Sequence, residues 1–329
     1  MSSTPSGRFA PSPSGDLHIG NLRTAVLAWL FARATDRGFV LRMEDLDRVR
    51  PGADVRQLDD LRALGLTWDE PVLYQSSRTA VYRAVVDELV AARRTFECFC
   101  TRREILEAPS APHAPQGAYP GTCRDLTAAQ RERRRAERPA AIRLRADVSS
   151  FRVHDVCRGE FIGDVDDFVL IRGDGIPAYN LAVVVDDAAS GIDQVVRGDD
   201  LLSSAPRQAY LATLLGHRPP EYAHVPLVCN RDGARLAKRD GAVTMADLAA
   251  HGVDAAGVLA MIGQSLGLSA PGEAVTLDLL AARFDPAALP RDPWIFVPPE
   301  HPRLIGGPAG KPRPTEAPQA GSSSSPRTK

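Results

Sequence analysis

The first part of the chain alternates short apolar runs with segments whose apolar residues recur at helical spacing. The apolar runs predict strands at residues 7–11 and 39–43. Helical spacing, with a proline that suits a first helical turn, predicts helices at 21–33, 51–64 and about 77–93. Short strands that alternate with helices are typical of a parallel sheet wound in crossover units, so we expect an α/β fold.

The alternation is interrupted at residues 97–158, which combine a Pro/Ala-rich stretch, an arginine-rich segment and closely spaced cysteines. We interpret this region as an insertion. The alternation resumes with predicted strands at 167–171, 194–196 and 225–228, and with helices near Leu181 and at 201–215.

Beyond Met245 the pattern predicts helices only. We therefore divide the chain into a main α/β domain (1–96 and 159–245), the insertion (97–158) and a small helical region (246–305). The last segment, 306–329, consists mostly of Gly, Pro, Ser and Ala. Such a composition buries too little apolar surface to offset its ordering entropy, so we expect a disordered tail.

Composition excludes several classes of protein. The formal net charge is −1, so any contact with nucleic acid must use a local patch and not bulk positive charge. The longest apolar run, residues 25–32, is too short to cross a membrane, and the polar N-terminus shows no secretory signal. Five cysteines without a disulfide framework fit a reducing compartment. We expect a cytoplasmic protein without membrane contact.

Residues 17–21 lie between a predicted strand and a predicted helix, and they include His18 and Gly20. Backbone N–H groups at a helix N-terminus suit a triphosphate, Gly20 lets a nucleotide approach the backbone, and His18 can donate to a phosphate. A basic loop at 235–239 supplies the cations that a departing pyrophosphate needs. Each feature alone also fits an interpretation without a functional role. His18 can be a histidine in a turn, and the basic loop can be a solvated surface loop.

Several sequence blocks, in the correct order, resemble the catalytic domain of the glutamyl-tRNA synthetases, which are class I aminoacyl-tRNA synthetases. The blocks are residues 8–15, 18–21, 42–47 and the basic loop. Residues 18–21 resemble the class motif HIGH, and residues 235–238 resemble the motif KMSK. The resemblance implies a Rossmann-like catalytic domain with ATP and Mg²⁺ as its nucleotide and metal. It implies that His18 and Lys238 are catalytic, and that the ATP-binding residues are His18, Gly20, Asn21 and Lys238.

Both motifs show departures in this sequence. Asn21 stands where the first motif has its second histidine. In the second motif, Arg235 replaces the first lysine and Ala237 replaces the serine, so only Lys238 carries over.

A free amino acid with a second carboxylate presents two anions and one cation, which call for guanidinium groups and one acidic acceptor. Arg8, Arg197 and Glu44 lie at the ends of predicted strands, where ligands bind in open α/β sheets, and Tyr179 can add a hydroxyl. Structural ion pairs and a buried tyrosine are the alternative. The resemblance implies an L-glutamate pocket lined by Arg8, Phe9, Ala10, Pro11, Ser12, Glu44, Tyr179 and Arg197.

Cys98 and Cys100 alone are weak evidence for zinc, which usually takes cysteines with two to four residues between them. Cys123 supplies a third thiolate, and Tyr119 is our candidate for the fourth ligand. The pattern resembles the structural Zn²⁺ site of the short glutamyl-synthetase paralogues. His113 as the fourth ligand, and no metal at all, remain alternatives.

Few residues follow the basic loop before the predicted tail, which leaves no domain to read a distant anticodon. Together with the Cys/Tyr pattern, this points to a resemblance to the glutamyl-Q tRNA(Asp) synthetases. In that family, activated glutamate goes to the queuosine base at the wobble position of tRNA(Asp). The implied protein is a monomeric ligase. A truncated glutamyl-tRNA synthetase that charges a tRNA 3′ end, and an inactive synthetase-like binding module, remain alternatives.

Overall fold

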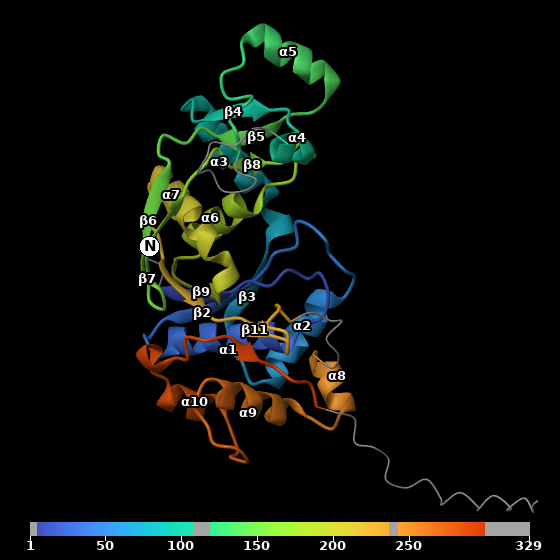
Figure 1. Cartoon of the computed structure of the whole chain (residues 1–329), viewed down its shortest axis with the longest axis vertical. Coiled ribbons are helices and arrows are strands. Elements are labelled where there is room, and N and C mark those ends of the chain that lie inside the picture. Colours follow the sequence, from blue (N-terminus) through green and yellow to red (C-terminus); the bar gives the residue numbers. More distant parts are fainter. Residues whose placement is uncertain (1–4, 108–118, 237–242, 300–329) are drawn as a thin grey trace, which may run out of the picture. The chain divides into compact units, whose positions relative to one another are not determined.

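The computed structural model describes residues 5–107, 119–236 and 243–299. Its centre is a seven-stranded sheet with the strand order β3-β2-β1-β9-β10-β6-β7 (Figure 1). All neighbouring strands in it are parallel except β6 and β7, which pair antiparallel. The expected mostly parallel α/β fold is confirmed. The strands are β1 (Ser6–Phe9), β2 (Gly38–Met43), β3 (Asp69–Tyr74), β6 (Ser150–Asp155), β7 (Gly159–Asp164), β9 (Ile192–Gly198) and β10 (Glu221–Val225).

The strand order reverses direction at β1, which pairs with β2 on one side and with β9 on the other. Chain connections from these two strands therefore leave toward opposite edges of the sheet, and a crevice opens at the carboxyl ends of β1 and β9. Ligands of open α/β sheets bind at such a switch point.

Helix α1 (Ile19–Arg33) connects β1 to β2 and is buried along most of its length, which fits its apolar sequence. It packs against β1, β2 and β9, and it also contacts α10 (Leu277–Arg283). Next to α10, the rings of Phe31 and Phe284 meet edge to face with centroids 5.1 Å apart. A helix enclosed in this way needs apolar side chains on more than one face.

Helices α6 (Tyr179–Ala189) and α7 (Ala205–Leu214) pack on the face of the sheet opposite α1. The neighbouring residues Val195 and Val196 of β9 show this, because Val196 joins the apolar cluster around α1 and Val195 joins the cluster with α7. A short 3₁₀ segment (Asp199–Ser204) precedes α7, where the sequence predicted a single helix at 201–215.

A separate three-stranded antiparallel sheet contains β4 (Thr95–Cys98), β5 (Ala141–Leu144) and β8 (Val169–Ile171) (Figure 1). The prediction that the strand at 167–171 resumes the parallel alternation was wrong. Its apolar residues Leu170 and Ile171 instead pack in the cluster with α3 and α6. Helices near this sheet in sequence are α3 (Thr79–Ala91), α4 (Arg102–Glu107) and α5 (Ala128–Glu137).

Strands β6 and β7 were not predicted, although they complete the central sheet. In β6 exposed residues alternate with more buried ones, and in β7 every residue is exposed or half-buried. Both strands carry charged residues, so they lack the apolar run that marks a buried parallel strand. The predicted strand at 225–228 is also interrupted, because β10 ends at Val225 and Pro226 separates it from β11 (Val228–Cys229). The division of the chain at 97–158 stays a prediction.

The region after residue 243 contains helices α8 (Met245–Ala250), α9 (Ala255–Ser265) and α10, as expected. It also contains a strand, β12 (Trp294–Ile295), which pairs in parallel with β11, so the prediction of helices only was wrong. Helix α2 (Ala53–Ala63) and the 3₁₀ turns at Gln75–Arg78 and Pro286–Ala288 complete the elements named here. Among the described residues, no helix combines the length and apolarity needed to cross a membrane.

Candidate functional site

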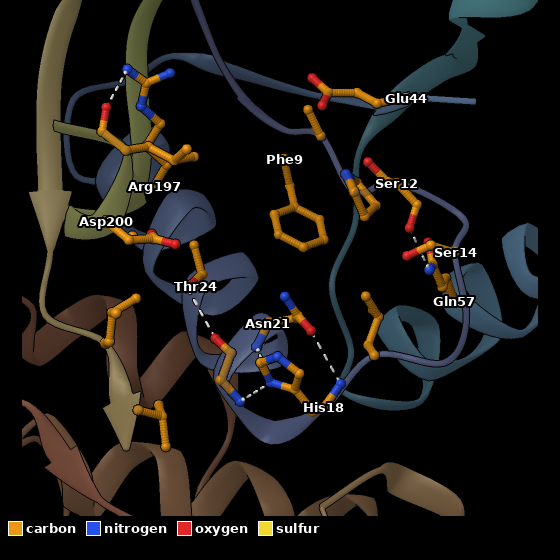
Figure 2. A pocket seen from close by; sticks show the side chains of 18 of the residues that line it. Phe9, Ser12, Ser14, His18, Asn21, Thr24, Glu44, Gln57, Arg197 and Asp200 are labelled. Atoms are coloured by element: carbon orange, nitrogen blue, oxygen red, sulfur yellow. Dashed lines mark hydrogen bonds between the residues drawn. The ribbon is translucent and has the colours of Figure 1, made fainter. Parts of the chain in front are cut away.

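A cavity of about 590 Å³ opens at the carboxyl ends of β1 and β9, at the switch point of the sheet. Figure 2 shows residues on its walls, including Phe9, Glu44, His18 and Arg197. Every described residue that the sequence assigned to the amino acid or to ATP lines this cavity. These residues are Arg8, Phe9, Ala10, Pro11, Ser12, His18, Gly20, Asn21, Glu44, Tyr179 and Arg197. Lys238 lies outside the described residues.

Arg8 is 4% exposed and brings a positive charge to the inner wall of the cavity. One Nη atom donates to the Val196 carbonyl at 3.1 Å, whereas Nε lies 3.6 Å from the Asp187 carboxylate, too far for a hydrogen bond. Burial lowers the pKa of the Arg8 guanidinium, and the positive charges of Arg42 and Arg197 lower it further against the opposing effect of Asp187. The inner wall therefore carries a cation that a bound anion would stabilise.

The positive charge of Arg42 balances the negative charge of the carboxylates behind this wall. It donates to Asp187 at 2.5 Å and to Glu44 at 3.2 Å, and it lies 3.9 Å from Asp186. Asp186 is fully buried, and Arg78 donates to it at 2.6 Å. Asp187 is buried as well. The structure places both in a buried ion-pair network.

Glu44 faces the cavity from the end of β2 and is the acidic group that the sequence predicted there. Burial raises the pKa of its carboxyl, while the neighbouring charges of Arg42 and Arg8 act in the opposite direction. An ammonium group bound beside Glu44 would favour the ionised carboxylate, so the side chain suits the cation of an amino acid.

Arg197 enters the cavity wall from β9, with its guanidinium surrounded by neutral acceptors. It donates to Nε2 of His224 at 2.9 Å, to Gln208 at 2.7 Å and to the Tyr179 hydroxyl at 3.3 Å. Tyr179 is the first residue of α6 and is 39% exposed, so the alternative of a buried tyrosine does not hold. Arg197 and Tyr179, which the sequence assigned to one pocket, both line the cavity.

The N-terminus of α1 forms the floor of the cavity near His18 (Figure 2). Nδ1 of His18 accepts from the backbone N–H groups of Gly20 and Asn21, at 3.1 and 3.3 Å. A neutral His18 ring therefore carries its proton on Nε2, as a donor. The Asn21 side chain accepts in turn from the His18 backbone N–H at 3.2 Å, which completes a capping box.

Close packing within the protein requires a glycine at position 20, in addition to the space that a bound nucleotide would need. A methyl group at this position would lie 2.9 Å from Cε1 of His18 and 3.3 Å from Cβ of Val228. The residue was predicted for the approach of a nucleotide, and the structure adds that it makes room for the His18 ring.

The capping box gives a test of the role of Asn21 in the fold. Replacing Asn21 with alanine should lower the free energy of unfolding by about 1 kcal/mol, because the His18 backbone N–H loses its partner. Urea unfolding of the two proteins measures the difference. Asn21→Gln is the matched control, since glutamine also closes capping boxes at this position, and it should retain most of the stability. Equal stability of the alanine and wild-type proteins would exclude a capping role.

The two ends of the basic loop are anchored beside α1 and β11. At the start of the loop, the Leu236 N–H donates to the Val228 carbonyl at 3.1 Å, and Arg235 forms an ion pair with Asp200 at 2.5 Å. After the loop, Ile19 N–H donates to the Val243 carbonyl at 2.8 Å. The described residues on both sides of 237–242 therefore adjoin the cavity.

The Cys98, Cys100 and Cys123 sulfurs gather within 4.8 Å of one another, away from the cavity. Sγ of Cys100 lies 3.6 Å from Sγ of Cys123, and Sγ of Cys98 lies 3.5 Å from the Tyr119 hydroxyl oxygen. The four predicted ligands thus come together. His113 lies outside the described residues. Cys157 and Cys229 are separate buried thiols.

Sequence reasoning missed several polar residues that support the site. Gln57 donates to the carbonyls of Ser12 and Gly15, at 3.1 and 2.6 Å, and so fixes the loop after β1. His224 and Asp155 lie behind Arg197. Gln57 lies within a helix, and nothing in the local sequence indicates such a role for it. Asp155 and His224 could have been noticed as two ionisable residues near the ends of neighbouring strands if β6 had been predicted.

Residues 6–284 match the family of tRNA synthetases class I (E and Q), catalytic domain. The chain is 65% identical over 294 residues to the glutamyl-Q tRNA(Asp) synthetase of Nocardia farcinica, covering 88% of this chain and 93% of that protein. It is 54% identical over 267 residues to the glutamyl-Q tRNA(Asp) synthetase of Cutibacterium acnes, covering 80% and 76%.

A solved structure with a similar fold is the glutamate tRNA ligase from Elizabethkingia meningosepticum in complex with its amino acid. The TM-score is 0.77 at 26% identity, and the match covers 90% of this chain and 67% of that one. Family match, close relatives and fold agree with the residues gathered in the cavity. The chain therefore belongs to the glutamyl-Q tRNA(Asp) synthetase family, within the class I synthetases for glutamate and glutamine.

Proposed function

We propose that this protein uses ATP to activate L-glutamate as glutamyl-adenylate and transfers the glutamyl group to the queuosine base of tRNA(Asp). One observation carries the first half: a single cavity combines two buried arginines and an acidic residue with a helix N-terminus that begins at His18. The names of the relatives support the second half. We further propose a cytoplasmic, monomeric enzyme, in keeping with its five free thiols.

The inner part of the cavity suits glutamate by charge. Arg8 and Arg197 supply guanidinium groups for the two carboxylates, and Glu44 supplies an acceptor for the ammonium group. We include Phe9, Ala10, Pro11, Ser12 and Tyr179 in this pocket because they line the same cavity. Glutamine would leave one guanidinium without its anion, so the pocket favours glutamate.

The outer part of the cavity suits the nucleotide. The N-terminus of α1 presents its positive end at His18, Gly20 and Asn21, where phosphate oxygens would accept hydrogen bonds. A glutamate carboxylate oxygen attacks the α-phosphorus, the bond to the bridging oxygen breaks, and pyrophosphate leaves with the electron pair. Negative charge grows on that leaving group, and His18 and Lys238 are the residues we assign to its stabilisation. Mg²⁺ bound with ATP would neutralise part of the phosphate charge.

In the transfer step, a hydroxyl of queuosine attacks the glutamyl carbonyl. An ester bond forms, the bond between the carbonyl carbon and the phosphate oxygen breaks, and AMP leaves with the electron pair. The hydroxyl proton passes to solvent or to the AMP phosphate. Bases of an anticodon loop can be splayed from their stack, so the same cavity can receive the wobble nucleotide. Positioning of the two reactants then supplies much of the rate.

Two assays test this function. Glutamate-dependent exchange of pyrophosphate into ATP, without tRNA, should be observed, because activation needs no tRNA in this scheme. Labelled glutamate should then attach to tRNA(Asp) from cells that make queuosine and not to tRNA from cells that cannot. Labelling of the queuosine-free tRNA would indicate a 3′-charging synthetase instead. Absence of exchange would indicate an inactive binding module, an alternative that the substitution at Ala237 raised.

We also propose that Cys98, Cys100, Tyr119 and Cys123 bind one structural Zn²⁺. On a tetrahedral zinc ion, two sulfur ligands lie about 3.8 Å apart, and a sulfur and an oxygen lie about 3.5 Å apart. The observed separations are 3.6 Å between Cys100 and Cys123 and 3.5 Å between Cys98 and the Tyr119 oxygen. The residues therefore fit a closed, four-coordinate site of the structural kind.

Replacing Cys123 with serine should remove the metal, because zinc affinity at such sites depends on thiolate ligands. We expect zinc content to fall from about one equivalent to less than about a tenth, together with a lower melting temperature. Metal analysis of the purified protein measures this. Cys229→Ser is the control, because Cys229 is buried outside the cluster and should leave the zinc content unchanged. Full zinc content in the Cys123 variant would contradict the site.

A further inference from the structure

Three polar residues line up across neighbouring strands behind the cavity. Arg197 of β9 and His224 of β10 are direct partners in the strand register, and Asp155 is the last residue of β6. Nε of Arg197 lies 2.9 Å from Nε2 of His224, and Nδ1 of His224 lies 2.5 Å from Asp155. His224 and Asp155 are both fully buried. The alignment thus joins a cavity residue to two groups that the reaction described above does not use.

The hydrogen bonds determine the tautomer of His224. A guanidinium can only donate, so Nε2 of His224 must accept the bond from Arg197. The ring proton therefore resides on Nδ1 and is donated to the Asp155 carboxylate. Burial lowers the pKa of His224, with the charges of Arg197 and Arg8 adding to the effect while Asp155 opposes it. A neutral imidazole with one fixed tautomer agrees with both observations.

Asp155 is itself held by the backbone. Its Oδ1 accepts from the N–H groups of Cys157 and Arg158 at 2.9 and 2.8 Å, and its Oδ2 accepts from the His224 N–H at 3.0 Å. Because these donors belong to the main chain, the carboxylate cannot rotate away from His224 without losing them. The imidazole is thus oriented by fixed groups on its far side.

The acceptors around Arg197 differ in kind from those around Arg42. Arg42 donates to the carboxylates of Asp187 and Glu44, which compensate its charge. Within the described part of the chain, no carboxylate lies within ion-pair distance of Arg197. An imidazole acceptor orients a guanidinium without neutralising it, so the charge of Arg197 stays available for an anionic ligand.

We propose that His224, oriented by Asp155, is a positioning residue that holds the Arg197 guanidinium in place for a carboxylate of the substrate. This inference rests on the proposed activation of glutamate. It assigns to His224 no proton transfer and no contact with the substrate. Its effect should therefore be seen in glutamate affinity and not in the use of ATP.

Two variants of His224 separate this role from a merely structural one. In His224→Gln, the amide oxygen can take the place of Nε2 and accept from Arg197, while the contact with Asp155 is lost. In His224→Asn, the shorter amide can take the place of Nδ1 and keep the contact with Asp155, while Arg197 loses its acceptor. The two amides are chemically alike, so each serves as the control for the other.

The measurement is pyrophosphate exchange as a function of glutamate and of ATP concentration. We expect His224→Asn to raise the KM for glutamate by about 10- to 100-fold, the effect of a lost buried hydrogen bond to a charged group. His224→Gln should stay within about threefold of wild type, and the KM for ATP should change little in either variant. A KM for glutamate that is the same in both variants, or higher in the glutamine variant, would overturn the proposal.

A second measurement reads the tautomer of His224 in the wild-type protein. Nitrogen NMR of the wild-type imidazoles should show the His224 ring protonated on Nδ1 alone, with its signal assigned to His224 by its loss in His224→Gln. Protonation of that ring on Nε2 would overturn the proposal. A wild-type protein without glutamate-dependent exchange would instead contradict the proposed function, so the two failures are distinguishable.

Discussion

Replacing Arg8 with methionine is expected to raise the KM for glutamate by about 10²–10³-fold. Arg8 is buried on the inner wall of the cavity, and methionine fills a similar volume without charge. Removing one partner of a buried, hydrogen-bonded charge pair costs about 2–5 kcal/mol, and each 1.4 kcal/mol is about tenfold in affinity. The KM comes from pyrophosphate exchange at increasing glutamate concentrations.

Two further variants make this result specific. Arg8→Lys keeps the charge but loses the planar fork, so it should recover only part of the affinity. Arg37→Met removes an arginine that is paired with Asp193 at 2.8 Å and precedes β2, at the end of the sheet opposite the cavity. It should leave the KM unchanged. Arg42 still pairs with Asp187 in the Arg8 variant, so we expect it to fold. A KM within about threefold of wild type would remove Arg8 from the pocket.

Replacing Lys238 with alanine should lower kcat for activation by about 10²–10³-fold, comparable with the loss of one preorganised donor to a developing anion. The KM for glutamate should change much less, because the negative charge on pyrophosphate grows only as the bond breaks. Single-turnover formation of glutamyl-adenylate measures the chemical step. Lys311→Ala is the matched control, since Lys311 lies beyond residues 6–284, which match the synthetase family. Activity within about threefold of wild type would exclude Lys238 from the mechanism.

The sequence predicted the parts of the fold that depend on local pattern. The strand, turn and helix that contain Arg8, His18 and Leu30 follow from apolar runs and helical spacing, and they appear with nearly the predicted bounds. The cavity residues could be predicted because the motifs keep the ends of β1, β2 and β9 recognisable. Lys238 lies outside the described residues, so its place in the site stays a prediction.

Features that depend on contacts between distant segments could not be predicted in the same way. Asp155 and His224 lie far apart in the sequence, and only the pairing of β6 with β10 brings them together. Val169 to Ile171 form an apolar run that fits a parallel or an antiparallel strand equally well, and packing in the small sheet decides between them. The pairing of β12 with β11 likewise has no local signal in a two-residue strand.

The pairing of β11 with β12 has a consequence for synthesis on the ribosome. Leu227 and Val228 form part of the cavity wall. Strand β12 pairs with the backbone of this segment, and the Trp294 N–H donates to the Leu227 carbonyl at 3.0 Å. During translation the chain emerges from its N-terminus, so the sheet can assemble before residue 294 leaves the exit tunnel. Val228 packs beside Gly20 in the nucleotide part of the cavity. We therefore expect a nascent chain stalled before that point to hold an incomplete cavity, and ATP binding to begin only after β12 emerges.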